Sequence, residues 1–219
     1  MSAHARLSAS AAERWFHCPG SVALSEREGV VGTSSFAAAQ GTLAHTLAAY
    51  CLTNRHDIRT RLGKTYKEGE HSITCDAEMV EGIQLYLDTC AEKRLREQWV
   101  ELGLLDPLVT WDKDLGGTAD YVTYDPAQKL LRVIDFKYGA GVFVSADFNK
   151  QLMLYAFGAM LAVNVPVDVV EVYIVQPRYE GAEPVRKQTF AAWDLREFAA
   201  DMAAAAKATR LPDAPLTPG

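Results

Sequence analysis

The chain contains 219 residues, of which 49% are hydrophobic and 23% are charged, and its formal net charge at pH 7 is −6. These values are ordinary for one globular domain with a substantial core, and the acidic balance argues against a surface that binds nucleic acid broadly. The cysteines lack paired spacing, the longest apolar run (residues 152–163) is too short to span a bilayer, and no signal sequence begins the chain, so we expect a cytoplasmic protein without a disulfide scaffold and without a membrane partner.

The N-terminal part of the chain has the signals of two helices. Ser10-x-x-Glu13 fits a capping box and predicts a helix over about residues 10–25. Thr33-Ser34-Ser35 offers an N-cap for a second helix over about residues 35–53. The apolar stripe of this second helix recurs at helical spacing and consists of Leu43, Leu47, Tyr50 and Cys51.

His45 lies on the opposite, small and apolar face of the second helix, one turn after Gly41. A glycine there lets another backbone or a ligand approach the helix closely. Two interpretations of His45 are open. It is either a hydrogen-bonded core histidine, or a metal ligand or a group that holds a metal-bound water.

The stretch from Arg55 to Lys67 is basic in an otherwise acidic chain. It contains five lysines and arginines and a single acidic residue, Asp57. It is a candidate loop or short helix that attracts phosphates, and an ordinary solvated surface is the alternative. Beyond it we expect a helix over about residues 76–97 and a strand near residues 99–105.

Two strands joined by a turn are predicted at the centre of the chain. The segments on either side of Asp125-Pro126-Ala127-Gln128 are rich in β-branched and aromatic residues, and the tetrapeptide itself has turn chemistry. Asp135 and Lys137 share one face of the second strand because side chains alternate. Asp120 joins that face only if the numbers of opposed residues add up to an odd value, and we predict this register.

Asp120, Asp135 and Lys137 together form a candidate catalytic group. Two carboxylates a few ångströms apart repel each other, and burial makes a lysine less stable as a cation. A hard divalent cation resolves this conflict, so the two aspartates are candidate ligands of Mg²⁺ or Mn²⁺. Lys137 would then orient or help deprotonate the attacking water and offset charge on a phosphate. The alternative is a hairpin with one structural Asp–Lys salt bridge.

A helix predicted over about residues 147–163 is apolar on nearly all sides but carries a polar seam. Gln151 and Tyr155 lie four residues apart and therefore share a face. They either satisfy polar groups of the core or bind substrate, by hydrogen bonds to a nucleic-acid backbone or by stacking on a base. Lys150 beside them is a candidate phosphate contact.

The C-terminal part supplies one more strand and one more helix. Residues 169–176 alternate little, which predicts a strand in the interior of the sheet, and a helix follows over about residues 193–209. The element order predicts an α/β fold in which helices flank a central mixed sheet, in one domain over residues 1–210. Residues 211–219 have the composition of a linker, and we expect the chain to be the front part of a longer protein.

Four short signals in a fixed order carry a family resemblance. They are Gly41-x-x-x-His45, Gly117-x-x-Asp120, Asp135-x-Lys137 and Gln151-x-x-x-Tyr155. In this order they resemble the PD-(D/E)xK nuclease superfamily, in the RecB-like exonuclease branch that includes CRISPR-associated exonucleases and phage-encoded nuclease domains. The resemblance covers roughly residues 8–180 and implies a restriction-endonuclease-like core that works with Mg²⁺ or Mn²⁺.

The resemblance also implies a role for each matched residue. The implied metal ligands are His45, Asp120, Asp135 and the backbone carbonyl of Phe136. The implied catalytic residues are Asp120, Asp135 and Lys137, and the implied substrate-facing residues are Gln151 and Tyr155. Glu101 stands near the place where this branch often has an upstream acidic residue, and it is a weaker candidate.

Cys18 lies in an entry segment that is also similar to the first helix of this branch, and it matches the first cysteine of the iron–sulfur members. Those members carry three more cysteines near the end, whereas this chain has none after Cys90. An iron–sulfur cluster held by this chain alone is therefore not expected. The alternative for Cys18 is a small buried hydrophobic residue.

The resemblance implies a metal-dependent deoxyribonuclease, in particular a phage or prophage exonuclease that acts on DNA in processing or recombination. DNA, single-stranded or with free ends, is the expected partner, together with further copies of the chain or a recombination protein. Two alternatives are a catalytically silent nucleic-acid-binding or interaction module on the same scaffold, and a phage assembly protein, which the acidic charge favours. The intact Asp120, Asp135 and Lys137 argue against the silent module.

Overall fold

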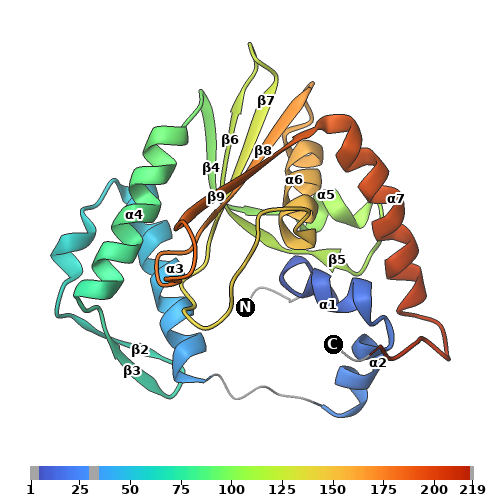
Figure 1. Ribbon diagram of the computed structural model, residues 1–219, viewed down its shortest axis with the longest axis horizontal. Coiled ribbons are helices and arrows are strands. Elements are labelled where there is room, and N and C mark those ends of the chain that lie inside the picture. Colours follow the sequence, from blue (N-terminus) through green and yellow to red (C-terminus); the bar gives the residue numbers. More distant parts are fainter. Residues whose placement is uncertain (1–4, 30–34, 218–219) are drawn as a thin grey trace.

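The computed structural model describes residues 5–29 and 35–217 of the chain (Figure 1). Its centre is a five-stranded sheet with the strand order β4-β6-β7-β8-β9. These strands are β4 (Glu97–Gly103), β6 (Thr118–Asp125), β7 (Leu130–Phe136), β8 (Val169–Val175) and β9 (Val185–Ala191). Strands β7 and β8 are parallel and the other neighbours are antiparallel, so the predicted mixed sheet of an α/β fold is confirmed.

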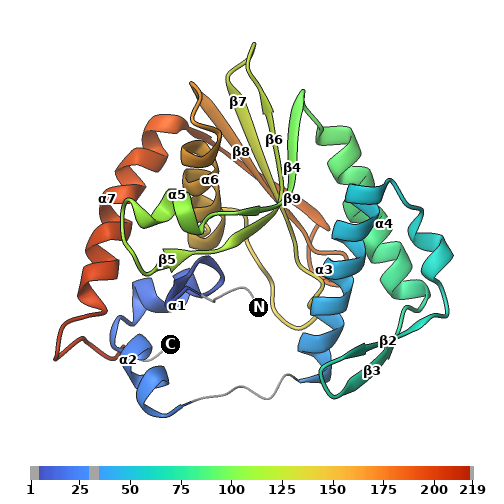
Figure 2. The same cartoon turned by 180° about the vertical axis from the view of Figure 1, so that it is seen from behind.

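Helices cover both faces of the sheet, as the two opposite views show (Figures 1 and 2). One layer consists of α1 (Ala12–His17), α5 (Leu105–Val109), α6 (Lys150–Val163) and α7 (Ala192–Ala208), with α2 (Gly20–Arg27) beside α1. The other layer consists of α3 (Phe36–Asn54) and α4 (Ala77–Lys93). The smaller elements are η1 (Ala9–Ala11), η2 (Ile58–Arg61), the hairpin of β2 (Thr65–Glu68) and β3 (His71–Thr74), and the parallel pair β1 (Leu7–Ser8) and β5 (Leu115–Gly116).

Each face of the sheet has its own buried cluster of apolar side chains. Val122 and Val133 pack with the layer of α6 and α7, whereas Tyr121 and Ile134 pack with the layer of α3 and α4. The strict alternation between neighbours follows from the pleat of the strands. Because each fully buried large apolar side chain contributes about 1.5–3 kcal/mol, this alternation fixes the faces that these four residues take.

The central hairpin has the register predicted from its alternation. Tyr121 is opposite Ile134 and Val122 is opposite Val133, so opposed residue numbers have an odd sum. In the turn, the Asp125 carboxylate accepts hydrogen bonds from the Ala127 amide and the Gln128 side chain, both at 2.8 Å. This local bonding is the turn chemistry expected of an aspartate before a proline. The register places Asp120 across from Asp135.

The predicted helix over residues 10–25 is wrong as a continuous element. Helix α1 ends at His17 and α2 begins at Gly20, with Pro19 as the residue that precedes α2. Proline has no N–H to donate into the preceding turn and its ring crowds that turn, so a continuous helix through position 19 would be strained. The chain therefore folds into two short helices in place of one long one.

The predicted capping box at the start of this region is also wrong. The N-cap residue of α1 is Ala11, which makes no side-chain cap. The Ser10 hydroxyl instead lies 3.2 Å from the Ser8 hydroxyl. A 3₁₀ turn, η1, takes the place of the expected first helical turn, and it shifts the start of the helix beyond Ser10.

The remaining helices begin and end close to the predicted positions. Ser35 caps α3 by accepting a hydrogen bond from the Ala38 amide at 3.1 Å, whereas Thr33 and Ser34 of the predicted cap lie outside the described residues. Helix α4 ends at Lys93, four residues before the predicted end, because the chain from Glu97 onward pairs with β6. Elements that the sequence did not predict are α5, β9, the hairpin of β2 and β3, and the pair β1 and β5.

Gly117 marks a position where an added side chain would be crowded by its neighbours. A Cβ atom there would lie 3.0 Å from Ala9 Cβ and 3.0 Å from the Tyr155 ring, and both neighbours are buried. We expect Gly117→Val to lower the free energy of unfolding by about 1–3 kcal/mol, because overpacking forces the neighbours apart. Gly41→Ala, at a helical glycine with open space around it, should instead stabilise the protein by about 0.5–1 kcal/mol. Urea unfolding of both variants measures the contrast, and a neutral Gly117→Val would contradict the close packing.

Glu171 joins strands β7, β8 and β9 through its carboxylate. It accepts hydrogen bonds from Arg132 at 2.5 Å, from Lys187 at 3.1 Å and from the Tyr173 hydroxyl at 3.0 Å. Burial opposes its ionisation, but these donors outweigh burial and hold the pKa of Glu171 below its ordinary value. A lowered pKa in the folded state means that this stabilisation is complete above the unfolded-state pKa and is lost as the pH falls through the folded-state pKa.

Glu171→Gln should therefore lower stability at pH 7 by about 1–3 kcal/mol, since hydrogen bonds to a charged group are removed. The difference between the variant and the parent protein should shrink as the pH falls below about 4, where the parent loses the same charge. Urea unfolding at pH 7 and at about pH 3.5 measures this. A difference that stays constant with pH would show that ionisation of Glu171 has no part in it.

The C-terminal residues lie against the N-terminal helices. The Pro215 carbonyl accepts a hydrogen bond from the Gly20 amide at 2.9 Å, and the Thr217 amide lies 3.2 Å from the Cys18 sulfur. Arg210, just after α7, forms ion pairs with Asp112 and Asp114. Among the helices that the structure describes, none is both long enough and apolar enough to cross a membrane.

Candidate functional site

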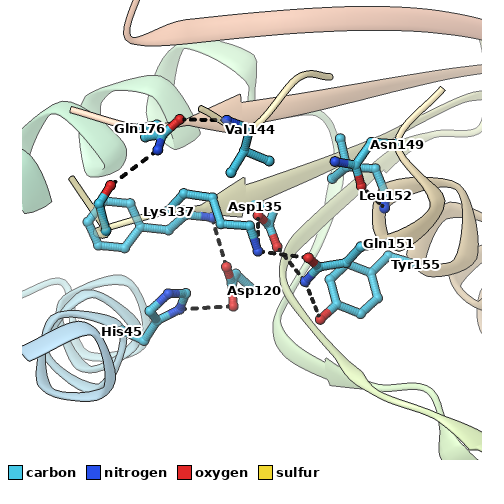
Figure 3. Close-up of polar contacts among 12 residues, drawn as sticks. His45, Asp120, Asp135, Lys137, Val144, Asn149, Gln151, Leu152, Tyr155 and Gln176 are labelled. Carbon is cyan, nitrogen blue, oxygen red and sulfur yellow. Dashed lines mark hydrogen bonds and ion pairs between the residues drawn. The ribbon is translucent and has the colours of Figure 1, made fainter. Parts of the chain in front are cut away.

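The sequence signals converge at the end of the central hairpin (Figure 3). Asp120 comes from β6, Asp135 comes from β7, and Lys137 directly follows β7. Helix α6 brings Gln151 and Tyr155 from one layer, and α3 brings His45 from the other layer (Figure 3). The cluster therefore combines the sheet with both helical layers.

Lys137 stands at the centre of a chain of polar contacts. Its ammonium lies 3.0 Å from Oδ2 of Asp135 and donates a hydrogen bond to Oε1 of Gln151 at 2.9 Å. The Gln151 amide nitrogen in turn donates to the Tyr155 hydroxyl at 2.9 Å and to Oδ1 of Asp135 at 3.4 Å. The polar seam predicted on the helix thus faces the carboxylates, and Gln151 fixes the direction of the Lys137 side chain.

Asp120 is held by two different neighbours. Its Oδ2 accepts a hydrogen bond from the Phe136 backbone amide at 2.8 Å, and its Oδ1 lies 3.2 Å from Nδ1 of His45. The first contact ties β6 to the end of β7, beyond the last paired residues of the hairpin. The imidazole of His45 is thus hydrogen-bonded while 37% of its side chain stays exposed, and both interpretations of this residue remain open.

The two carboxylates differ in their electrostatic surroundings. Burial raises the pKa of Asp135, and Asp120 adds to the rise although Lys137 opposes it. Burial acts in the same direction at Asp120, but contacts with His45, the Phe136 amide and Lys137 outweigh it and lower the pKa of that carboxyl. Burial disfavours a charged His45, yet the Asp120 carboxylate prevails and raises the pKa of the imidazole. Such pairs of acids with diverging pKa values are common at catalytic sites.

A cavity of about 160 Å³ opens beside the cluster and is bordered by His45, Asp120 and Glu101. Glu101 interrupts the pairing of β4, because its neighbours Val100 and Leu102 pair with β6 whereas Glu101 has a positive φ of 51°. It stands opposite Asp120 in that register, so the structure brings this weaker candidate to the site. A non-glycine residue with positive φ is uncommon and often marks a functional position.

The donor groups at this site fit a hard divalent cation that needs few protein ligands. Within the described ranges, no three His, Cys, Asp or Glu side chains are already arranged as around a metal, and the role of His45, Asp120, Asp135 and the Phe136 carbonyl as metal ligands stays a prediction. Oδ2 of Asp135 is buried and accepts no hydrogen bond in the described chain, and Lys137 is its ion-pair partner. Mg²⁺ is usually held by one or two carboxylates together with waters and substrate phosphates. Asp120 and Asp135 meet that requirement.

Lys150, the predicted phosphate contact, is not brought to the cluster. The Lys150 ammonium lies over the rings of Phe16 and Phe198, at 5.6 Å and 5.9 Å from their centroids. Neighbouring residues on a helix point about 100° apart, so Lys150 leaves the face that carries Gln151. In the basic stretch, Arg59 pairs with Asp57 and the Arg61 guanidinium lies over the Tyr50 ring at 4.7 Å.

Gln176 is a site-supporting residue that the sequence did not single out. It directly follows β8, is 1% exposed, and donates hydrogen bonds to the carbonyls of Gly139 at 3.1 Å and Val142 at 2.7 Å. Its oxygen accepts from the Val144 amide at 3.2 Å (Figure 3). The available signal was a polar residue at the end of an apolar strand, because a buried amide needs partners for both of its ends.

The sequence matches a known protein family, and the description of that family names no activity. A family model described as a protein of unknown function, DUF2800, matches residues 4–219. The match covers nearly the whole chain and includes every residue of the polar cluster. The chain belongs to the DUF2800 family.

Proposed function

We propose that this protein is a metal-dependent nuclease of the PD-(D/E)xK type, most specifically an exonuclease that hydrolyses phosphodiester bonds in DNA. The observation that carries the proposal is the shared face of Asp120, Asp135 and Lys137, with the lysine fixed between Asp135 and Gln151. Two carboxylates with an oriented ammonium are the groups that phosphodiester hydrolysis needs. The order of the sequence signals supports the same chemistry.

Each residue of the cluster has a different role in the proposed hydrolysis, which follows from its position. A bound Mg²⁺ or Mn²⁺ held by Asp120 and Asp135 would polarise the phosphate and favour attack by water. Lys137 offsets the negative charge that builds on the phosphate, and its contact with Gln151 holds the ammonium in place before substrate arrives. The contact with His45 helps to lower the pKa of Asp120, and the ionised carboxylate is the form that can hold a cation.

The acidic net charge is compatible with a nucleic-acid substrate once cations occupy the site. Glu101, Asp120 and Asp135 gather negative charge around one small region, and divalent cations invert the local potential there. Cleavage would then depend on the metal, whereas substrate binding would involve few basic contacts. A weak dependence of substrate binding on salt concentration is the expected result.

The test is cleavage of end-labelled single-stranded and double-stranded DNA with Mg²⁺ or Mn²⁺. EDTA and the variant Asp135→Ala should each abolish release of the label, and the labelled end that is lost first gives the polarity. Asp168→Ala, which removes an exposed carboxylate paired with Lys129, is the matched control and should cleave like the parent protein.

Two other outcomes would lead to different conclusions. Binding of DNA without cleavage under any metal, by a folded sample, would favour a silent binding module on the same scaffold. Cleavage that persists in Asp135→Ala would place the activity elsewhere or in a contaminant. Either result would overturn the proposed role of the Asp120, Asp135 and Lys137 group.

A further inference from the structure

A second cavity, of about 560 Å³, is bordered by Lys137, by Gln151 and by residues of the segment 142–149. One side of it consists of the apolar residues Val142, Phe143, Val144 and Phe148. Its volume is in the range of sites that hold small organic ligands. The cavity is continuous with the polar cluster, because it shares Lys137 and Gln151 with it.

The apolar side of this cavity is exposed but held in place. Phe143 is 43% exposed and Phe148 is 66% exposed. The Phe143 ring makes a tilted contact with the Tyr179 ring, at a centroid distance of 5.3 Å, and the Arg186 guanidinium lies over the Phe143 ring at 4.8 Å from its centroid. Exposed aromatic rings cost hydration free energy, so a fixed and exposed ring that borders a cavity indicates a binding surface.

Two polar side chains anchor the backbone that carries Phe143. Gln176 bonds the segment on both sides of it, through the Val142 carbonyl and the Val144 amide. Arg186 donates to the Val144 carbonyl at 2.8 Å and 3.1 Å and to the Gln176 oxygen at 2.6 Å. A loop tied down by a buried amide and a guanidinium is preorganised, which lowers the entropy that a ligand must overcome.

The charges of the cavity decide which part of a nucleotide fits it. Lys137 is its one cation among the described residues, and it stands at the end next to the carboxylates. Glu13 and Asp147 border the rest of the cavity, so a run of phosphates along it would be repelled. A neutral group with a flat apolar face suits the surface formed by Phe143 and Phe148, and a nucleobase has such a face.

We propose that Phe143 and Phe148 form a base-binding wall, which accepts an unpaired nucleotide whose phosphate lies at Lys137. This inference rests on the proposed function and narrows it to substrates with a single-stranded end. A base inside a duplex is stacked on both sides and cannot present its face, whereas an unpaired base can. The wall therefore lets the protein select unpaired ends by their bases, and this selection does not require a basic groove.

Binding in EDTA tests the wall separately from cleavage. Fluorescence anisotropy compares a short oligothymidylate, an abasic strand of equal length and equal charge, and a duplex. We expect the oligothymidylate to bind about tenfold or more tightly than the abasic strand, since stacking on one aromatic ring contributes that much. Equal affinity for these two strands, no binding of either, or equal affinity for the duplex would overturn the proposal.

Variants of Phe143 then test whether its ring causes the preference for the oligothymidylate over the abasic strand. Phe143→Leu keeps an apolar side chain without a π face and should bring the ratio of the two affinities close to one, whereas Phe143→Tyr should retain it. Trp111→Leu is the matched control, because Trp111 is 45% exposed and packs on Phe157, at a separate cavity near the end of α6. An unchanged ratio in Phe143→Leu, with thermal unfolding like that of the parent, would also overturn the proposal.

The two proposals can fail independently. Preference for the oligothymidylate without any metal-dependent cleavage would overturn the nuclease and leave a module that binds unpaired bases at the wall. Cleavage without that preference would support the nuclease and remove the base-binding wall.

Discussion

Replacing Lys137 by methionine should reduce DNA cleavage by at least about a hundredfold to a thousandfold, the usual effect of removing one group that stabilises charge in a transition state. Methionine keeps much of the length of the side chain but cannot donate to Gln151 or pair with Asp135. Single-turnover cleavage with excess protein measures the loss separately from binding. A rate like that of the parent protein would remove Lys137 from the mechanism.

Loss of the lysine also has a cost in stability that must be separated from catalysis. Asp135 is 2% exposed, and without the ammonium its pKa should rise further because Lys137 opposes the effect of burial. The double variant Lys137→Met with Asp135→Asn should recover stability, since no unpaired charge is left, and should stay inactive. Lys93→Met is the matched control, because the Lys93 side chain is 28% exposed and that of Lys137 is 23% exposed.

Asp120→Asn should weaken the response of cleavage to Mg²⁺ or Mn²⁺ by at least about tenfold. Replacing a group that only supports a metal ligand already lowers affinity by about 10–100-fold, and Asp120 is itself the proposed ligand. Asparagine keeps one oxygen, which can still accept the hydrogen bond from the Phe136 amide, so the hairpin end should remain intact. Titration of cleavage rate against metal concentration gives the shift directly.

Asp114→Asn provides the comparison for this variant. The Asp114 side chain is 18% exposed and that of Asp120 is 21% exposed, and each is paired with a cationic or titratable partner. Its metal dependence should match that of the parent protein. If Asp120→Asn and Asp114→Asn gave the same metal titration, Asp120 would not be a ligand.

The central hairpin could be predicted because several independent signals agree there. Val122 and Val133 bury one face while Tyr121 and Ile134 bury the other, so a shift by one residue would expose both sets. The same constraint places Asp120 and Asp135 on one face. Gln151 and Tyr155 followed from helical spacing, which depends only on local geometry.

The parts that could not be predicted depend on tertiary contacts. Strand β9 is an edge strand in which Phe190 is the one buried residue, so its sequence lacks the nearly continuous apolar run that marks the buried strand β7. The break before α2 was not predicted because the residues around Pro19 have a helical pattern, and the proline outweighs that pattern in the folded chain. Gln176 depends on a loop that is distant in sequence, since its partners lie about 35 residues earlier in the chain.

Gln151 lies on α6, which follows the strands of the site in the chain, and this order affects how the site assembles during synthesis. The strands that carry Asp120 and Asp135 leave the ribosome before α6 does, because α6 begins at Lys150. Until that helix is made and docks, Lys137 has no Gln151 to fix its direction. A nascent chain therefore carries the carboxylates before the polar cluster is assembled, and the order of translation delays assembly of the cluster until α6 has packed on the sheet.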